Sequence, residues 1–377
     1  QQIYVDQGAV IDVAGSSGVK ADVGENIISV ELRGSELANS PLQRDGPLRG
    51  QSIQVDLRKH GSWDPTRNNG LGGYTWIGTP LADTSGWLAL ATHSVDELTV
   101  NGGSVALKAG GAVVLQSGST VDVSGGSIDY QAGYTQTSMV SANGYLYDIS
   151  QATPDRKYDG IYSGTTTRTD TKWGVTTTTT NPLSQSTYEA GYTQGGNGGS
   201  LSISSPILAL DGSMLGNTTA GAGQRTLSPL YDSANPPDPA TTVTTGVPGW
   251  LIGALSRPLP GQFSLSIGRQ YQTDDGSYHD YSPTPANIVF TTTSSLPAAD
   301  AFAPLGEPLA PSSYLFPTAR KYELDLSPLL VETTSGAGFG IVKINNSDDA
   351  VGTGEGVGSI TVKSGTSLTL APGGSLE

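Results

Sequence analysis

The sequence Glu97–Gly126, ELTVNGGSVALKAGGAVVLQSGSTVDVSGG, decides the fold because its apolar residues recur at a nearly fixed interval. They come in pairs spaced by two residues, so both side chains of a pair point to the same face of a short strand. Successive pairs follow after seven, eight and eight residues, and the segments between them hold the glycine, asparagine and serine of tight turns. The pairs are Leu98/Val100, Val105/Leu107, Val113/Leu115 and Val121/Val123.

The same eight-residue step returns near both ends of the sequence. Short strands joined by tight turns cannot bury an apolar row alone, but they can do so by coiling and stacking on copies of themselves. The pattern therefore predicts an all-β chain built on a β-solenoid. The residues that mark the step are Ile3, Ile11 and Val19 at one end and Ile360, Leu368 and Leu376 at the other.

The octapeptide Gly8–Gly15, GAVIDVAG, aligns with Gly118–Gly125, GSTVDVSG. Each contains an aspartate, Asp12 or Asp122, between two inward-facing apolar residues, so we expect both carboxylates to face solvent. A calcium site would need several oxygen ligands on one loop. The glycine-rich nonapeptide that provides such ligands in other β-solenoids is missing, so no metal is expected at these aspartates.

Composition restricts the partners. The chain has 377 residues and no cysteine, which excludes disulfides, thiolate metal sites and a cysteine nucleophile. The formal net charge of −15 disfavours binding to nucleic acid and to anionic membranes. The sequence contains no apolar run of about 18 residues, so no membrane-spanning helix is expected.

Three long excursions interrupt the eight-residue period, and insertions at the turns of a solenoid leave the stacked coils undisturbed. The segments 25–96, 130–198 and 224–320 are called the first, second and third excursions below. The predicted divisions are a solenoid coil at 1–24, an extra-helical insertion at 25–96, coils at 97–129, a Tyr/Thr-rich β insertion at 130–198, a coil at 199–223, a Pro-rich irregular insertion at 224–320 and coils at 321–377.

The first excursion contains two alternating segments, Ile27–Leu32 and Ile53–Leu57, that read as strands. We expect its three tryptophans to pack a small core of its own. Its histidines have no second ligand at metal-binding spacing, so a surface or packing role is expected for both. The tryptophans are Trp63, Trp76 and Trp87, and the histidines are His60 and His93.

The second excursion opens with YQAGYTQ at 130–136 and closes with YEAGYTQ at 188–194, which predicts two strands side by side at the base of a stalk. The run Thr176–Thr180 predicts an exposed strand, because β-branched polar residues suit a half-solvated sheet. Tyrosine suits both a small core and stacking on sugars, and the sequence leaves both roles open. The candidate contact residues are Tyr130, Tyr134, Tyr145, Tyr147, Tyr188 and Tyr192.

Enzymatic activity is not expected, although carbohydrate-active enzymes also use stacked-strand folds. Adjacent acids on a strand point to opposite faces, and the acid pairs here lie in turn-like sequence. No nucleophile elbow accompanies the three histidines, and no cofactor is expected. The candidate catalytic clusters considered are Asp155/Arg156/Asp159, Asp274/Asp275 and Asp348/Asp349, with His279 near the second.

Beyond the repeat, four segments of the excursions are distinctive: Val30–Arg58 (VELRGSELANSPLQRDGPLRGQSIQVDLR), Trp76–Gly86 (WIGTPLADTSG), Tyr147–Gly164 (YDISQATPDRKYDGIYSG) and Lys172–Leu183 (KWGVTTTTTNPL). With these segments the chain resembles one branch of the filamentous-haemagglutinin-like large exoproteins of the bacterial two-partner secretion family. The resemblance implies a right-handed parallel β-helix, export through an outer-membrane transporter, and a location at the bacterial cell surface or outside the cell.

The expected function is therefore that of a structural and adhesive segment of a secreted surface fibre, cut from a longer protein. A coil of about 23 residues would give about eight coils and a rod about 40 Å long. Open coil ends predict head-to-tail self-association, and the excursions would contact surface glycans or the surfaces of host or neighbouring cells. The alternative is a carbohydrate-binding or polysaccharide-degrading β-helix protein.

Overall fold

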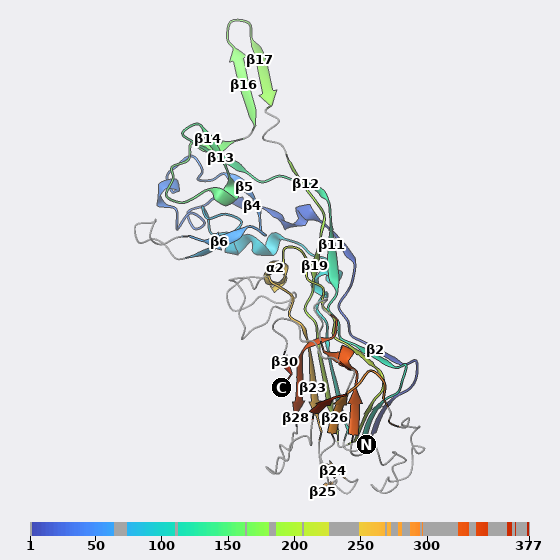
Figure 1. The fold of residues 1–377 in the computed structure, drawn as a ribbon. Helices are drawn as coiled ribbons and strands as arrows, with labels where there is room; N and C mark the ends of the chain where they lie inside the picture. Colours follow the sequence, from blue (N-terminus) through green and yellow to red (C-terminus); the bar gives the residue numbers. More distant parts are fainter. Residues whose placement is uncertain are drawn as a thin grey trace.

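The computed structural model shows an all-β chain with few helices, in which several sheets are parallel. It is elongated, with parallel strands at the base and a hairpin at the far end (Figure 1). The structure describes residues 2–63, 74–109, 112–162, 164–180, 186–205, 207–225, 249–267, 270–272, 278–280, 287–294, 296, 323–331, 337–345, 360–363, 366 and 375–376.

Two parallel sheets at the base each take one strand from three distant parts of the chain. The first has the order β1-β9-β21 and the second the order β2-β10-β22. Because the chain visits the two sheets in the same order each time, every pass adds one strand to each. The strands are β1 (Gln2–Val5), β2 (Val10–Asp12), β9 (Ala112–Leu115), β10 (Thr120–Asp122), β21 (Ile207–Leu210) and β22 (Ser213–Leu215).

The longest sheet in the described part of the chain has five parallel strands in the order β30-β28-β23-β20-β8, rather than strands from about eight coils. A further parallel sheet has the order β27-β26-β29. The strands are β8 (Ser104–Lys108), β20 (Ser200–Ser204), β23 (Gly261–Ser266), β26 (Asn287–Phe290), β27 (Glu323–Leu326), β28 (Phe339–Asn345), β29 (Ile360–Val362) and β30 (Ser375–Leu376). These sheets, with the two described above, form what we call the scaffold.

The aligned octapeptides are neighbours in the scaffold. Val10, Ile11 and Asp12 pair with Thr120, Val121 and Asp122 in parallel register. A step of eight residues therefore moves the chain to the next sheet, whereas the next strand within one sheet lies 110 residues along the sequence, from Ile11 to Val121. The interval is this long because an excursion separates successive passes, which explains the small number of strands in each sheet.

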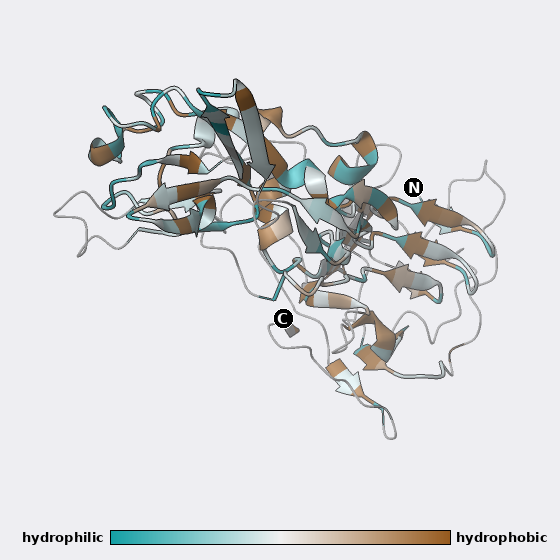
Figure 2. Ribbon diagram, turned by 90° about the horizontal axis from the view of Figure 1, so that it is seen from above, coloured by the Kyte–Doolittle hydropathy of each residue, from teal (hydrophilic) through white to brown (hydrophobic). Residues whose placement is uncertain are grey.

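The inward residues of three of the four apolar pairs belong to one buried cluster, which confirms their predicted orientation. Val113, Leu115, Val121 and Val123 are fully buried in it. The other members include Val5, Leu107, Leu201, Ile203, Leu208, Leu210, Phe263, Leu265, Phe290 and Phe339. Figure 2 shows the apolar strands of the scaffold stacked beside the N-terminus.

The prediction of a strand through Leu98 and Val100 is wrong. The chain forms the short helix α1 (Val95–Leu98), because Ser94 begins it with a capping box in which the Ser94 hydroxyl and the Glu97 carboxylate each accept a backbone hydrogen bond from the other residue. Val100 is buried in a separate cluster with Ile128 and Tyr130.

The first two excursions and the α2 region of the third form a second body, which we call the lobe, together with a hairpin, whereas the third excursion also contributes β23 and β26 to the scaffold. The lobe contains antiparallel sheets and the helix α2, and the apolar side chains of these elements form one buried cluster. Its elements are β4 (Ile27–Glu31), β5 (Ser52–Asp56), β6 (His60–Ser62), β7 (Thr75–Ile77), β13 (Met139–Ala142), β14 (Tyr145–Asp148), β15 (Gly160–Tyr162) and α2 (Gly249–Leu255). The short 3-10 helices of the described residues are η1 (Val23–Asn26), η2 (Pro41–Gln43), η4 (Ser85–Leu90), η5 (Ile149–Gln151) and η9 (Pro328–Leu330).

The core of the lobe draws on all three excursions rather than on the first alone. Leu32 and Leu57 come from the first, Val140 and Tyr158 from the second, and Leu251 from the third. The expected tryptophan core is wrong, because aliphatic side chains dominate this cluster. Trp87 and Trp250 pack against its edge, while Trp63 and Trp76 do not belong to it.

The two tyrosine motifs pair as predicted. Strand β11 (Ser127–Gln131) runs antiparallel to β19 (Tyr192–Gly195), and β12 (Gly133–Thr135) runs antiparallel to β18 (Thr187–Glu189). Strand β3 (Val19–Asp22) pairs with the other side of β11 in parallel. These strands connect the scaffold to the lobe (Figure 1).

The predicted exposed threonine strand is also present. Strand β17 (Val175–Thr180) is exposed along its length and pairs with β16 (Thr165–Asp170) in the terminal hairpin. Within residues 224–320, predicted as a Pro-rich irregular insertion, β23 and β26 are strands of the scaffold sheets. The short pair β24 (Gln270–Gln272) and β25 (Tyr278–Asp280) is antiparallel. None of the described helices is long and apolar enough to cross a membrane.

Side-chain amides add hydrogen bonds between passes of the chain. The Asn101 Oδ1 accepts a hydrogen bond from the amide of Asn197, and the Asn197 Oδ1 accepts one from the amide of Leu259, both at 2.8 Å. Backbone groups at the turns, which the sheets leave unpaired, are satisfied in this way.

Glycines permit close backbone contact where the chain turns from the scaffold toward the lobe. The amide of Gly126 donates to the Val100 carbonyl at 2.7 Å, and the amide of Ser127 donates to the Ser16 carbonyl at 2.9 Å. A Cβ on Gly126 would overlap that Ser16 carbonyl, and a Cβ on Gly15 would overlap the Val100 carbonyl. Only glycine fits both positions without moving backbone.

We expect Gly126→Ala to lower the free energy of unfolding by about 2–3 kcal/mol, because the added methyl group must push two backbone segments apart. Gly34→Ala is the matched control, since a Cβ there meets nothing within 4 Å, and its effect should stay within about 0.5 kcal/mol. Denaturant unfolding of the two variants provides the measurement. Equal stabilities would show that the close contact is not required.

Candidate functional site

A partly buried cluster of ionisable residues lies where the chain leaves and re-enters the scaffold around the first excursion. Glu25 belongs to η1, directly after β3. Its Oε1 accepts a hydrogen bond from the Asp22 amide at 3.1 Å, as part of the capping box that begins η1. Its Oε2 is buried and receives no hydrogen bond from the described residues.

His93 and Glu97 come from the end of the same excursion. The Ser94 amide donates to the Glu97 Oε2 at 2.6 Å, which fixes the carboxylate of Glu97. The other oxygen, Oε1, lies 3.2 Å from the His93 Nδ1. Their side chains are only 4% and 5% exposed, so this pair is almost fully withdrawn from water.

The three side chains converge. One ligand atom each from Glu25, His93 and Glu97 lies within 4.8 Å of the other two. Burial raises the pKa of Glu25, and the neighbouring Glu97 carboxyl raises it further. Burial alone would raise the pKa of Glu97 too, but hydrogen bonds from Ser94 and His93 outweigh it and lower that pKa. The two carboxyls therefore differ in how readily they ionise.

The surroundings of the cluster come from the other excursions. The His93 ring lies 4.1 Å from the ring of Trp250, which belongs to α2. A small cavity of about 20 Å³ lies beside the pair, lined by His93, Glu97, Tyr130, Trp250 and Asn197 among others. That volume suits about one water molecule. Burial also raises the pKa of the Tyr130 hydroxyl, so this group stays protonated.

His93 packs against Trp250, as a packing role predicts, and the structure also brings the carboxyl groups of Glu97 and Glu25 close to its ring. His93 and Glu97 are four residues apart around the start of α1, and that spacing puts two side chains on one face of a helix. The spacing was visible in the sequence, whereas nothing in the sequence points to Glu25. His60 has the expected local role, because its Nδ1 lies 3.1 Å from the Arg58 carbonyl.

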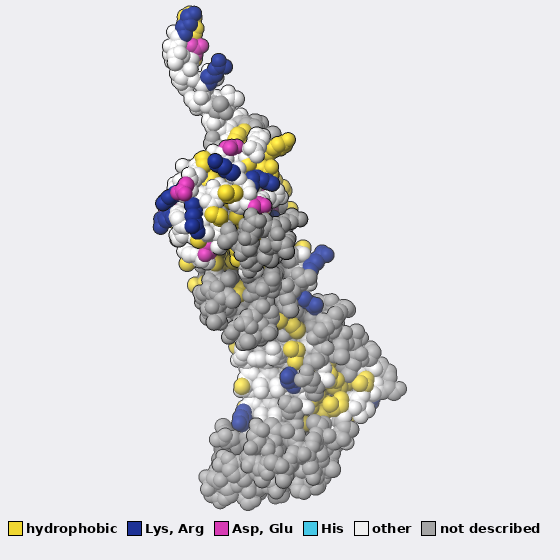
Figure 3. All heavy atoms as spheres, turned by 90° about the vertical axis from the view of Figure 1, so that its left-hand side faces the viewer, with side chains coloured by type: hydrophobic (Ala, Val, Ile, Leu, Met, Phe, Trp, Pro, Cys, Tyr) yellow, Lys and Arg dark blue, Asp and Glu magenta, His cyan; other side chains and the backbone are white. Residues whose placement is uncertain are grey.

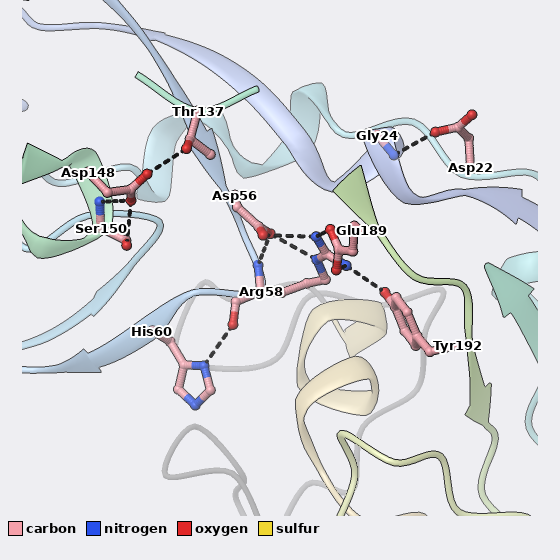
Figure 4. Close-up of polar contacts among 10 residues, drawn as sticks. All are labelled: Asp22, Gly24, Asp56, Arg58, His60, Thr137, Asp148, Ser150, Glu189 and Tyr192. Carbon is pink, nitrogen blue, oxygen red and sulfur yellow. Dashed lines mark hydrogen bonds and ion pairs between the residues drawn. The ribbon is translucent and has the colours of Figure 1, made fainter. Parts of the chain in front are cut away.

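A second polar cluster, around Arg58, joins the first and second excursions (Figure 4). The guanidinium is 13% exposed and donates to both carboxylate oxygens of Asp56 at 2.9 Å. It also donates to both oxygens of Glu189 at 2.6 Å and to the Tyr192 hydroxyl at 3.1 Å. Burial alone would lower the pKa of Arg58, but these hydrogen bonds raise it, so the residue stays charged.

The Arg58 cluster is closed. Bidentate bonds to two carboxylates use most of the donors of a guanidinium, and the ring of Tyr192 covers it with its centroid 5.6 Å away. Such an arrangement holds two excursions together and leaves little capacity for a ligand.

The six candidate tyrosines do not form one surface. Tyr130 is buried and stacks on Tyr192, with ring centroids 4.7 Å apart. Tyr147 packs against the core of the lobe beneath the guanidinium of Arg156. The exposed members are Tyr134, Tyr188 and Tyr145, of which Tyr134 and Tyr188 form an edge-to-face pair with centroids 5.4 Å apart.

The acidic cluster that lies within the described residues, Asp155/Arg156/Asp159, shows contacts typical of a turn. Asp159 Oδ2 accepts a hydrogen bond from the Asn143 amide at 3.0 Å, which stabilises a turn. Arg156 lies over Tyr147 instead of pairing with either aspartate among the described contacts. Asp274/Asp275 and Asp348/Asp349 lie outside the described residues, and only the backbone of His279 is described, in β25. Asp12 and Asp122 each accept a hydrogen bond from the amide two residues later.

Comparison with known proteins adds no family to these observations. Searches of family models, of curated proteins and of solved structures found no match to this chain.

We expect Arg58→Ala to lower the free energy of unfolding by about 3 kcal/mol, because it leaves the buried Asp56 carboxylate without its cation. Arg49→Ala is the control, since Arg49 pairs with Asp45 at 3.5 Å with both side chains exposed, and such pairs contribute less than about 1 kcal/mol. Chemical denaturation of both variants measures the difference. An Arg58→Ala protein as stable as the control would contradict a joining role for the cluster.

Proposed function

We propose that this chain is a non-catalytic segment of a secreted bacterial surface fibre, in which a right-handed parallel β-helix carries side excursions that make adhesive contacts. The β-helix is supported by the repeated order in which the chain visits the parallel sheets, with aligned repeats in register. In such a fold the stacked strands extend the rod, and side insertions are tolerated at the turns.

The surface location and the export through an outer-membrane transporter rest on the resemblance of the excursion sequences to filamentous-haemagglutinin-like exoproteins. The absence of cysteine and the net charge of −15 are compatible with that proposal. Head-to-tail association of subunits remains part of it, because strands at the end of a parallel stack keep unpaired hydrogen-bonding groups.

The observation that carries the adhesive role is the distribution of exposed aromatic and charged side chains. Trp173, at the turn of the terminal hairpin, is 71% exposed, with the ammonium of Lys172 5.2 Å from its ring. Tyr145 and Leu146 are exposed on β14 of the lobe. Charged side chains gather on the lobe and at the end of the hairpin (Figure 3). Exposed aromatic residues are typical of protein contact sites.

We expect Trp173→Ala and Tyr145→Ala to reduce adhesion of protein-coated beads to fixed epithelial or bacterial cells severalfold, because each removes a large exposed contact group. Both variants should keep the thermal midpoint of the wild type, since neither side chain is buried. Leu329→Ala is the matched control, an exposed apolar residue in η9 of the scaffold. Adhesion that is unchanged in both aromatic variants would refute the proposed contact surface.

A carbohydrate-binding role is the second candidate, and the exposed pair of Tyr134 and Tyr188 favours it. Two exposed aromatic rings on adjacent strands can stack on the apolar faces of sugar rings. They lie at the base of the stalk, apart from the buried pair of Tyr130 and Tyr192.

On a glycan array, we expect any bound glycan to be lost when Tyr134 and Tyr188 are both changed to alanine. Tyr145→Ala is the control that leaves this pair intact. An array without binding would exclude the carbohydrate role, and release of reducing ends from pectin or chitin would overturn the non-catalytic assignment.

A further inference from the structure

The cluster of Glu25, His93 and Glu97 brings together the half-buried Glu25 and the buried Glu97 without a permanent cation. No lysine or arginine forms an ion pair with Glu25 or Glu97 among the described residues. The Arg58 cluster provides the contrast, because there two carboxylates share one guanidinium. Buried carboxylates are normally paired with a cation or coordinate a metal.

Two atoms of the cluster are left without partners. The Glu25 Oε2 and the His93 Nε2 are both buried and make no hydrogen bond with described residues. The His93 side chain is more than nine-tenths buried, and it lines the small cavity together with Glu97. Each unsatisfied buried polar atom costs about 1–3 kcal/mol, so a ligand that used these groups would relieve that cost.

We propose that Glu25, His93 and Glu97 form a binding site for one divalent transition metal ion, with Zn²⁺ as the best-suited ion. One imidazole and two carboxylates are ligands of the kind that Zn²⁺ takes, at about 2.0–2.2 Å from the metal. One ligand atom from each of the three residues lies within 4.8 Å of the other two, so the three side chains can reach one ion together. Ca²⁺ fits poorly, because it takes six to eight oxygen ligands.

The neighbouring cavity supplies the remaining coordination position. Its volume of about 20 Å³ beside His93 and Glu97 accommodates one water molecule, which would be the fourth ligand. Two carboxylates, one neutral imidazole and one water leave a divalent ion with no net charge at the site, so the buried charge is balanced.

A metal ion at this site would stabilise the structure, because the three ligands lie at the two ends of the first excursion. Glu25 lies where the chain leaves β3, and His93 and Glu97 lie where it returns toward β8. Trp250 of α2 packs on the His93 ring. A bound ion would therefore fasten both ends of the first excursion to each other and support the contact with the third. This inference is independent of the adhesive role proposed above.

Isothermal titration of the EDTA-treated and dialysed full chain with Zn²⁺ tests the site. We expect one ion per chain, a rise in the thermal midpoint on binding, and at least a tenfold loss of affinity in both Glu25→Gln and His93→Asn. His60→Asn is the matched control, because His60 lies outside the cluster and should leave the affinity unchanged.

Co²⁺ provides a second readout that does not depend on stability. Its visible absorption reports coordination by nitrogen and oxygen ligands, and we expect the band to be lost in Glu25→Gln, which removes a charge from the cluster without changing its shape. Circular dichroism establishes that each variant is folded. Absence of stoichiometric Zn²⁺ binding by the wild type, or binding that survives both cluster substitutions, would overturn the proposal.

Discussion

The parallel register between strands about 110 residues apart is the constraint on which the rest of this structure depends. Ile11 must lie beside Val121 although an entire excursion separates them, because the inward side chains bury each other only in that register. A shift by one residue would turn Val121 toward solvent. Each excursion therefore has to bring the chain back to the position from which it left, one strand further along the stack.

The glycines at the turn make that return possible. Where strands on successive passes approach through their backbones, as at Gly15 and Gly126, the hydrogen bonds between passes leave no space for a Cβ. The first excursion begins near Val23 and ends near Glu97, and the second begins near Tyr130 and ends near Tyr192. All four positions lie a few residues along the chain from the glycine contacts between passes. The excursions thus emerge from one part of the scaffold and are close enough to bury their apolar residues together.

The sequence was most informative where a pattern is local or symmetric. The eight-residue step predicted the inward orientation of Val113 and Val121, and the two YxAGYTQ motifs predicted that β11 and β12 pair with β19 and β18. The antiparallel register follows from the equal spacing of the tyrosines, because Tyr130 meets Tyr192 only if Tyr134 meets Tyr188. At Leu98 the sequence contains both an apolar alternation, which predicts a strand, and the capping box of Ser94 and Glu97, which predicts a helix. The capping box determines the structure there.

The core of the lobe and the cluster of Glu25, His93 and Glu97 could not be predicted from local sequence patterns, because both depend on contacts between distant segments of the chain. Leu57, Val140 and Leu251 have no periodic relation to one another, and their burial together follows only from the common origin of the excursions on the scaffold. For the same reason Glu25 could not be linked to His93, although two of the three cluster residues, His93 and Glu97, are related by their spacing in the sequence.

The two polar clusters at the junction show how such contacts can be built in different ways. Around Arg58, the protein supplies both charges, so the link between β5 and β18 is complete in the polypeptide itself. Around Glu25, the protein supplies two carboxyls and a histidine whose second nitrogen has no partner in the described residues. The first arrangement is fixed once the chain is folded, whereas the second would be completed by the cation proposed above. The strength of the junction between scaffold and lobe would then depend on the availability of that cation, while the register of the scaffold would not.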